Sequence, residues 1–346
     1  MRKHAFNILC SFICACTVLA PTQAIAKKRL DTDLVAALHA TQKLDNRVLD
    51  IGYRLVSANA KYCRPQAMRA GMSLHDIAQY RAPKEARAAY RFDTDISVNA
   101  VVKGGPAEKA GIALNDGILA IEGRAIASLL AETASRKKRK NYARMEYING
   151  FLDEALGRGQ VTLLVKRGDK ETEHVVKTEA ACPSLFVLDT SKGLSAGSNG
   201  HYVRVTIGFA EYAKNDDELA VILAHELAHN LLKHRQRLKD AKVKRGLFKG
   251  SGRSGRLSKA TELEADRLSL WLLANAGFNP NAAVDFWKRR RGGKGLKSIF
   301  PSGTHYRWKK RVRFLEQEMI QLKAAPVIDG LRAPHLLINP AANLAK

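Results

Sequence analysis

After its first 26 residues, this 346-residue chain lacks a hydrophobic run long enough to cross a membrane, which takes about 20 residues. The apolar run at 8–20 follows Arg2 and Lys3 and precedes a small-residue site at 24–26, the pattern of a cleavable signal peptide. We therefore expect residues 1–26 to be removed on export and the mature protein to be soluble. The content of 46% hydrophobic and 26% charged residues excludes overall disorder, and the length suggests two or more domains.

Cysteine is scarce. Three of the five cysteines lie in the segment to be removed, which leaves Cys63 and Cys182. One pair in an oxidising compartment is most simply a disulfide, and two buried free thiols are the alternative. A lipoprotein acylated at Cys16 is a further alternative, but the hydrophobic run continues past that residue and favours cleavage after Ala26.

Acidic residues are also scarce, 33 against 58 Lys and Arg, which gives a formal net charge of +25. Basic clusters lie at residues 136–140, 233–259 and 288–297. Such a surface attracts polyanions, and export makes nucleic acid a poor candidate, so none is expected. Peripheral contact with an anionic membrane surface, through phospholipid headgroups or glycolipid phosphates, is favoured. The alternative is a solvated basic face.

One short stretch carries chemistry. His225 and His229 lie four residues apart, so on a helix they share a face and can bind one metal ion, while Glu226 reaches the water that this metal activates. This spacing also arises by chance, so its context matters. Asn215 is a suitable N-cap followed by acids, and Leu and Ile recur at helical spacing after it. The pattern predicts a helix over 216–235.

A catalytic zinc site takes three protein ligands and keeps one position open. A second amphipathic helix is predicted over 261–275, where Glu262 and Asp266 share a face and Glu264 points elsewhere. We assign Glu262 as the third ligand and Asp266 as the acceptor that orients a ligating histidine. The alternative is a solvated acidic helix start, which favours the helix dipole.

The two helices resemble the gluzincin family of CAAX prenyl proteases and HtpX-type membrane proteases, in particular its soluble branch in the bacterial envelope. The resemblance covers residues 202–318 and implies one Zn²⁺ per chain, held by His225, His229 and Glu262, with Glu226 as general base of peptide hydrolysis. It also implies that residues 202–207 form an exposed edge strand, which can hold an extended substrate through backbone hydrogen bonds.

A late segment of the same family is similar to residues 302–305 together with Arg311. Arg311 is accordingly expected behind the metal ligands. His305 is expected either to donate a hydrogen bond to the oxyanion or to occupy the open zinc position in a resting enzyme. A surface histidine is the alternative.

Residues 101–123 contain a strand, a Gly-Gly-Pro turn and a short helix, followed by a second strand and a tight turn. This segment resembles a bacterial protease PDZ domain. Residues 160–167 and 171–177 are predicted to close it as a hairpin around Gly168. Asn115 stands where glycine is usual, and Asn tolerates the left-handed conformation. A merely structural β-domain is the alternative.

The expected fold class is α+β: a mainly helical gluzincin-type metalloprotease domain with a small edge-exposed sheet, preceded by a PDZ-like β domain. The expected order is a signal peptide (1–26), a helical segment (27–90), a PDZ-like domain (91–180), a zinc metalloprotease domain (183–323) and an irregular tail (324–346).

The expected function is that of a periplasmic zinc metalloendopeptidase, which hydrolyses unfolded or misassembled envelope proteins. One alternative is a non-catalytic PDZ-type peptide-binding protein or chaperone of the envelope. The other is a basic nucleic-acid-binding protein, against which the predicted signal peptide argues.

Overall fold

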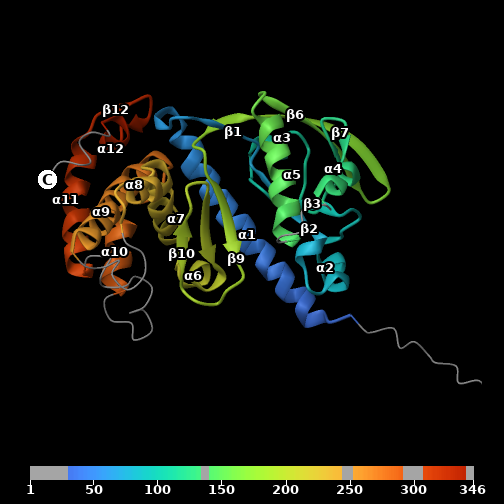
Figure 1. Cartoon of the computed structure of the whole chain (residues 1–346), viewed down its shortest axis with the longest axis horizontal. Coiled ribbons are helices and arrows are strands. Elements are labelled where there is room, and N and C mark those ends of the chain that lie inside the picture. Colours follow the sequence, from blue (N-terminus) through green and yellow to red (C-terminus); the bar gives the residue numbers. More distant parts are fainter. Residues whose placement is uncertain (1–29, 134–139, 244–251, 291–306, 340–346) are drawn as a thin grey trace, which may run out of the picture.

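The computed structural model describes residues 30–133, 140–243, 252–290 and 307–339. The signal peptide predicted for residues 1–26 lies outside them. The fold is α+β, as predicted. A sheet-rich N-terminal half and a mainly helical C-terminal half lie side by side, and the long helix α1 (Thr32–Ala58) runs between them (Figure 1).

The N-terminal half is built on an antiparallel sheet in the order β2-β3-β4-β6-β7, with the short β5 beside β4. Helices α4 (Ile126–Thr133) and α5 (Lys140–Leu156) pack on it, and α3 (Pro106–Lys109) contacts β7. The strands are β2 (Met72–Asp76), β3 (Ile96–Val101), β4 (Gly117–Ile121), β5 (Arg124–Ala125), β6 (Gln160–Arg167) and β7 (Lys170–Lys177).

Two local predictions for this half are confirmed. Strands β6 and β7 pair along their whole length as the expected hairpin around Gly168. Asn115 adopts the left-handed conformation with φ 68°, and its side chain accepts a hydrogen bond from Gln42 of α1.

The sheet begins before residue 91, where the sequence places the boundary of the β domain. β2 lies inside the segment expected to be helical and pairs with β3. That segment is helical only in α1, the one-turn 3₁₀ helices η1 (Ala60–Tyr62) and η2 (Ile77–Gln79), and α2 (Pro83–Tyr90). The strand escapes prediction because it is short and one of its inward residues is a histidine. His75 is buried among the rings of Tyr80, Tyr90 and Phe92.

Helix α1 holds the two halves together. Asn46 accepts a hydrogen bond from the backbone N–H of Val101 in β3, at 2.9 Å. The next residue, Arg47, pairs with Asp216 at 2.7 Å and donates to the carbonyl of Ala210 in the C-terminal half. Adjacent residues of one rigid helix therefore bind both halves.

A three-stranded sheet opens the C-terminal half in the order β10-β11-β9, formed by β9 (Leu185–Asp189), β10 (Ala196–Ser198) and β11 (Tyr202–Thr206). β11 pairs parallel with β9 and antiparallel with β10. The prediction that residues 202–207 form the sheet edge is therefore wrong, because β11 is the central strand and β10 and β9 are the two edges. The residues of β10, Ala-Gly-Ser, have low strand propensity, so the sequence does not signal this strand.

Helices complete the C-terminal half. They are α6 (Ile207–Tyr212), α7 (Asp216–Leu231), α8 (His234–Asp240), α9 (Gly252–Asn275), α10 (Asn281–Arg290) and α11 (Trp308–Ala324). α7 packs against α9 and is buried along most of its length. As predicted, Asn215 caps α7, since its side chain accepts from the N–H of Glu218 at 3.0 Å.

Two helix limits differ from the prediction. α7 ends at Leu231 rather than at 235, because Lys233 adopts a left-handed conformation (φ 53°). α9 begins at Gly252 rather than at 261, so part of the basic cluster at 233–259 is helical. Gly255 and Ser258 are buried there, and packing overrides their low helix propensity.

The predicted disulfide is present. Cys63 and Cys182 are bonded, with their Cα atoms 5.3 Å apart and 119 positions apart in the sequence. Beside it, β1 (Ala67–Arg69) pairs with β8 (Glu179–Ala181). The bond joins the chain that follows α1 to the chain that enters the C-terminal sheet.

The predicted irregular tail is partly ordered. Between residues 324 and 339 it contains the hairpin of β12 (Val327–Ile328) and β13 (Leu331–Arg332) and the short helix α12 (His335–Ile338). Asn275 of α9 binds both the N–H and the carbonyl of Arg332. Pro326 and Pro334 lie just before β12 and α12 and interrupt neither, so proline alone does not predict irregular structure here.

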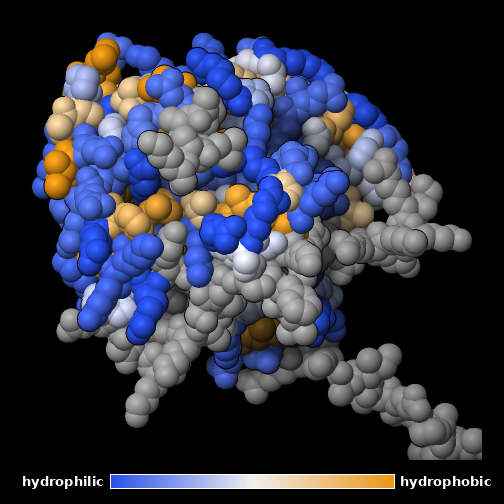
Figure 2. All heavy atoms as spheres, turned by 60° about the vertical axis from the view of Figure 1, so that its left-hand side comes forward, coloured by the Kyte–Doolittle hydropathy of each residue, from blue (hydrophilic) through white to orange (hydrophobic). Residues whose placement is uncertain are grey.

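Among the described helices, none combines the length and the apolar composition that a membrane span requires. Figure 2 shows a mostly hydrophilic face, on which hydrophobic residues form a short row across the middle and small separate groups elsewhere.

Candidate metal centre

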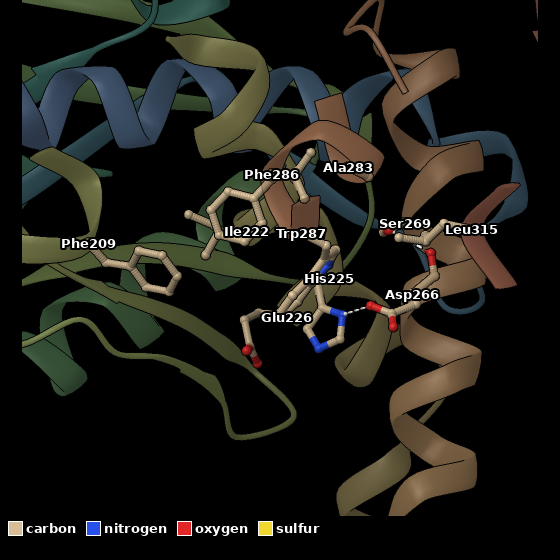
Figure 3. A pocket seen from close by; sticks show the side chains of 11 residues that line it. Phe209, Ile222, His225, Glu226, Asp266, Ser269, Ala283, Phe286, Trp287 and Leu315 are labelled. Carbon is tan, nitrogen blue, oxygen red and sulfur yellow. Dashed lines mark hydrogen bonds and ion pairs between the residues drawn. The ribbon is translucent and has the colours of Figure 1, made fainter. Parts of the chain in front are cut away.

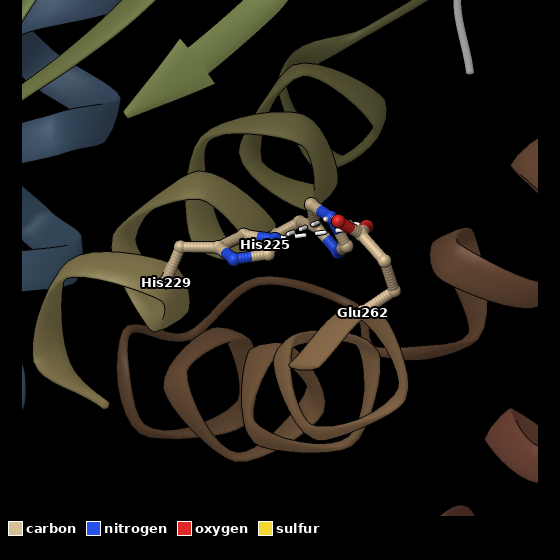
Figure 4. A group of neighbouring side chains, drawn as sticks. All are labelled: His225, His229 and Glu262. Carbon is tan, nitrogen blue, oxygen red and sulfur yellow. Dashed lines mark hydrogen bonds and ion pairs between the residues drawn. The ribbon is translucent and has the colours of Figure 1, made fainter. Parts of the chain in front are cut away.

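Helix α7 presents two histidines toward α9. His225 and His229 are one helical turn apart, and their Nε2 atoms lie 3.2 Å from each other (Figure 4). His225 is buried and His229 is partly buried. Because both Nε2 atoms converge on one point, the pair can bind a single metal ion.

Glu262 reaches the same point from α9 (Figure 4). Its Oε2 atom lies 3.3 Å from Nε2 of His225 and 3.7 Å from Nε2 of His229. In a tetrahedral zinc site with metal–ligand distances of about 2.0–2.1 Å, neighbouring ligand atoms are about 3.3–3.4 Å apart. Two imidazoles and one carboxylate are also a known ligand set of catalytic zinc. The three side chains therefore fit Zn²⁺ in both spacing and chemistry.

Asp266 lies where the sequence predicts it. Its Oδ1 atom is 3.0 Å from Nδ1 of His225, on the side of the ring away from the metal-binding nitrogen (Figure 3). Arg311 of α11 binds both carboxylate oxygens of Asp266, one of them at 2.7 Å, and its guanidinium lies 3.6 Å from the ring centre of Trp287. Arg311 thus holds Asp266, and Asp266 orients His225.

The charges in this cluster depend on one another. Burial alone would raise the pKa of Asp266, but Arg311 and His225 outweigh it and hold that pKa below its usual value. Burial would likewise lower the pKa of His225, but the hydrogen bonds that its ring N–H groups donate to Asp266 and Glu262 raise that pKa to about 10 when no metal is bound. A metal ion at Nε2 must therefore displace a proton.

Glu226 points away from Asp266, on the other side of the His225 ring (Figure 3). Its Oε2 atom accepts a hydrogen bond from Ser198 Oγ of the edge strand β10, at 3.1 Å. A small pocket lies next to His225 and Glu226, with apolar walls that include Phe209, Ile222 and Phe286. The candidate base thus lies between the metal ligands, an edge strand and an apolar wall.

The structure adds a residue that the sequence analysis passes over. Nδ1 of His234 lies 2.9 Å from Nδ1 of His229, and its Nε2 lies 3.0 Å from Oε2 of Glu264. Glu264 thus points away from the ligand face, as predicted, and Arg237 of α8 binds it at 2.5 and 3.1 Å. Burial lowers the pKa of His234 to about 4, although Glu264 opposes that shift. On a straight helix His234 would lie off the face of His229, so its spacing carries no signal.

A second missed residue is Asn230, which follows His229 in α7. Its side chain accepts from the N–H of Gly200 at 2.7 Å and donates to the carbonyl of Tyr202 at 3.3 Å and to Ser184 Oγ at 3.1 Å. These bonds fix the turn between β10 and β11 against the metal-binding helix. Ser198 is thereby held close to Glu226.

The structure brings together six of the residues singled out for this site or its support. They are His225, Glu226, His229, Glu262, Asp266 and Arg311. His305, predicted as an oxyanion donor or as a plug of the open zinc position, lies outside the described residues.

Comparison with known proteins matches two segments of the chain. Residues 192–244 match the model of peptidase family M48, and residues 67–143 match the PDZ domain model. The first segment contains His225, Glu226 and His229, and the second begins ahead of β2 and therefore agrees with the early start of the sheet.

Two curated relatives are both described as the mitochondrial metalloendopeptidase OMA1. The chain is 30% identical to the protein of Schizosaccharomyces pombe over 164 residues. This aligned region covers 42% of this chain and 45% of that relative. The chain is also 30% identical to the protein of Saccharomyces cerevisiae over 139 residues. This aligned region covers 35% of this chain and 37% of that relative. The chain thus matches less than half the length of these relatives.

Proposed function

We propose that this protein is a zinc-dependent endopeptidase of the gluzincin type, with one Zn²⁺ held by His225, His229 and Glu262. The observation that carries the proposal is the convergence of these three ligand atoms at the spacing of a tetrahedral zinc site. The matches to peptidase family M48 and to two metalloendopeptidases support the same reaction class.

Zinc bound here would polarise the scissile carbonyl and acidify the attacking water. The protein's own part falls to Glu226, which takes a proton from that water and delivers it to the leaving amine nitrogen. Ser198 holds this carboxylate through its hydrogen bond, and the pair formed by Asp266 and Arg311 keeps His225 in one orientation.

The sequence suggested that β11 holds the substrate. We propose instead that the substrate binds as an extended strand along β10. β10 is one of the two edge strands of its sheet, and Ser198 at its end touches Glu226. An extended peptide added at this edge would lie beside the metal ligands. Backbone pairing favours unfolded or loop segments, with little demand on side chains.

The proposed setting is the bacterial periplasm, with unfolded or misassembled envelope proteins as substrates. The leader pattern at residues 1–26 and the disulfide between Cys63 and Cys182 support export. The excess of Lys and Arg supports peripheral contact with an anionic membrane surface.

The PDZ match favours a second candidate, a non-catalytic protein that captures peptides through this domain. The two candidates differ in what happens to an unfolded protein mixed with the zinc-loaded chain. A peptidase degrades reduced, alkylated lactalbumin, stops when a zinc chelator is added, and resumes when Zn²⁺ is restored. Binding without cleavage by protein that carries stoichiometric zinc would favour the second candidate.

A further inference from the structure

We propose that His234 is a positioning residue for the metal ligand His229 and links that ligand to the carboxylate of Glu264. The proposal rests on the proposed zinc site and adds a residue that orients it. Its basis is a continuous chain of side chains, in which His229 contacts His234 at 2.9 Å and His234 contacts Glu264 at 3.0 Å.

The proton positions in this chain follow from its ends. When Nε2 of His229 binds a metal, its ring proton is on Nδ1, which donates to Nδ1 of His234. The proton of His234 is then on Nε2, where it donates to Oε2 of Glu264. With the other tautomer of His234, two N–H groups would face each other and Glu264 would lose the donor that His234 provides. One arrangement therefore satisfies all three side chains.

Glu264 is a suitable end for this chain. It is 6% exposed, His234 is 1% exposed, and Arg237 binds both carboxylate oxygens. His234 also donates to one of these oxygens, so a carboxylate, which only accepts, satisfies both donors. The anionic charge is thus held in a fixed position behind the ligand.

The two metal-binding histidines are supported in parallel ways. His225 is oriented by Asp266, which Arg311 holds. His229 is oriented by His234, then by a carboxylate, which an arginine again holds. The contacts of each metal-binding histidine thus lead to a carboxylate that an arginine holds. The path from His229 contains one more imidazole, that of His234.

Local backbone geometry makes the second path available. Lys233 takes a left-handed conformation that ends α7 and turns His234 back toward His229. α9 supplies Glu262 to the metal and, two residues later, Glu264 to His234. Helices α7 and α9 therefore provide the metal ligands, and α8 and α9 provide the support of His229.

The test is zinc affinity, measured by chelator competition on the purified full chain, so peptidase activity plays no part in it. Loss of a residue that orders a metal ligand typically lowers metal affinity by about 10- to 100-fold. His234→Asn keeps an amide oxygen close to the position of Nδ1 and can still accept from His229, so its affinity should stay within about threefold of wild type. His234→Gln places its amide near the position of Nε2, cannot serve His229, and should bind zinc about 10- to 100-fold more weakly.

Glu264→Gln keeps the shape of the side chain at this position and removes its charge, so it should also weaken zinc binding. This variant tests the proposal if a His234 variant fails to fold. His39→Ala, an exposed histidine on α1, is the control. The absorption spectrum of the Co²⁺-loaded protein should change in His234→Gln and not in His234→Asn.

The proposal is overturned if the Asn and Gln variants lose affinity equally, or if His234→Gln and Glu264→Gln both bind zinc as wild type does. A wild-type chain that binds no zinc would instead remove the proposed function itself.

Discussion

Ser198 of the edge strand β10 donates a hydrogen bond to Glu226 of the metal-binding helix, at 3.1 Å. This bond connects the strand proposed to hold the substrate to the residue proposed to move the proton. Glu226 thereby has a fixed direction before any substrate arrives.

Ser198→Ala should lower kcat about tenfold and leave zinc content unchanged, because a hydrogen bond to a charged group contributes about 1.5–3 kcal/mol and part of that is replaced by water. Steady-state cleavage of an unfolded protein measures the effect. Ser195→Ala is the matched control, since the hydrogen bonds of Ser195 with Thr206 use backbone atoms of Ser195. Equal rates for the two variants would show that Ser198 does not hold Glu226.

Removing one member of the ion pair between Asp266 and Arg311 should destabilise the fold more than removing the charges of both. Arg311→Met leaves a buried carboxylate without its main partner and should destabilise the fold by about 3–5 kcal/mol. Adding Asp266→Asn removes that charge, so the double variant should be less destabilised than Arg311→Met alone. Urea unfolding of the metal-free proteins measures this, and a double variant that unfolds more easily than the single one would argue against the pairing.

The disulfide should stabilise the exported protein. Cys63 and Cys182 lie 119 positions apart, and closing a loop of this size contributes about 4.9 kcal/mol in the chain-entropy model, with measured losses typically about 2–5 kcal/mol. Replacing both residues with Ala should lower the free energy of unfolding by about 2–5 kcal/mol. A reductant should then have no further effect on this variant, whereas it should destabilise the wild type. Free thiols in the oxidised wild-type protein would contradict the bond.

Asp45 gives the fold a dependence on pH. Burial raises the pKa of this carboxyl to about 6, although a hydrogen bond from Asn99 opposes the shift. The folded protein therefore holds the proton more tightly than the unfolded chain, and this contribution to stability is present below about pH 4 and lost as the pH rises to about 6.

Between pH 4 and pH 8, the effect of Asp45→Asn on the free energy of unfolding should shift toward stabilisation by about 2–3 kcal/mol, since each pKa unit corresponds to about 1.4 kcal/mol. Thermal unfolding at both pH values measures the difference. Asp93→Asn, at an exposed position, is the control. An effect of Asp45→Asn that is the same at both pH values would contradict the raised pKa.

The metal site is largely predictable from the sequence because its main signals are local. The spacing of His225 and His229 specifies one helical face, and the spacing of Glu262 and Asp266 specifies another. Each helix needs only its own pattern of apolar residues and its own cap to be recognised. The choice of Glu262 over Glu264 follows from helical geometry alone.

What could not be predicted depends on long-range packing. The edge strand β10 is built from Ala, Gly and Ser, and pairing with β11 rather than propensity makes it a strand. His234 reaches His229 only because Lys233 takes a left-handed conformation, which no local pattern indicates. The early start of the N-terminal sheet depends on a buried histidine, a residue type that does not mark a core strand.

The central claim is that Glu226 moves protons beside a zinc ion that other residues hold. Its most direct test is Glu226→Gln, with zinc content and cleavage of an unfolded protein measured on the same sample, beside Glu262→Gln. We predict that Glu226→Gln keeps one zinc per chain and loses cleavage by at least about a thousandfold, whereas Glu262→Gln loses both. Cleavage that persists in zinc-loaded Glu226→Gln, or stoichiometric zinc in Glu262→Gln, would contradict the account.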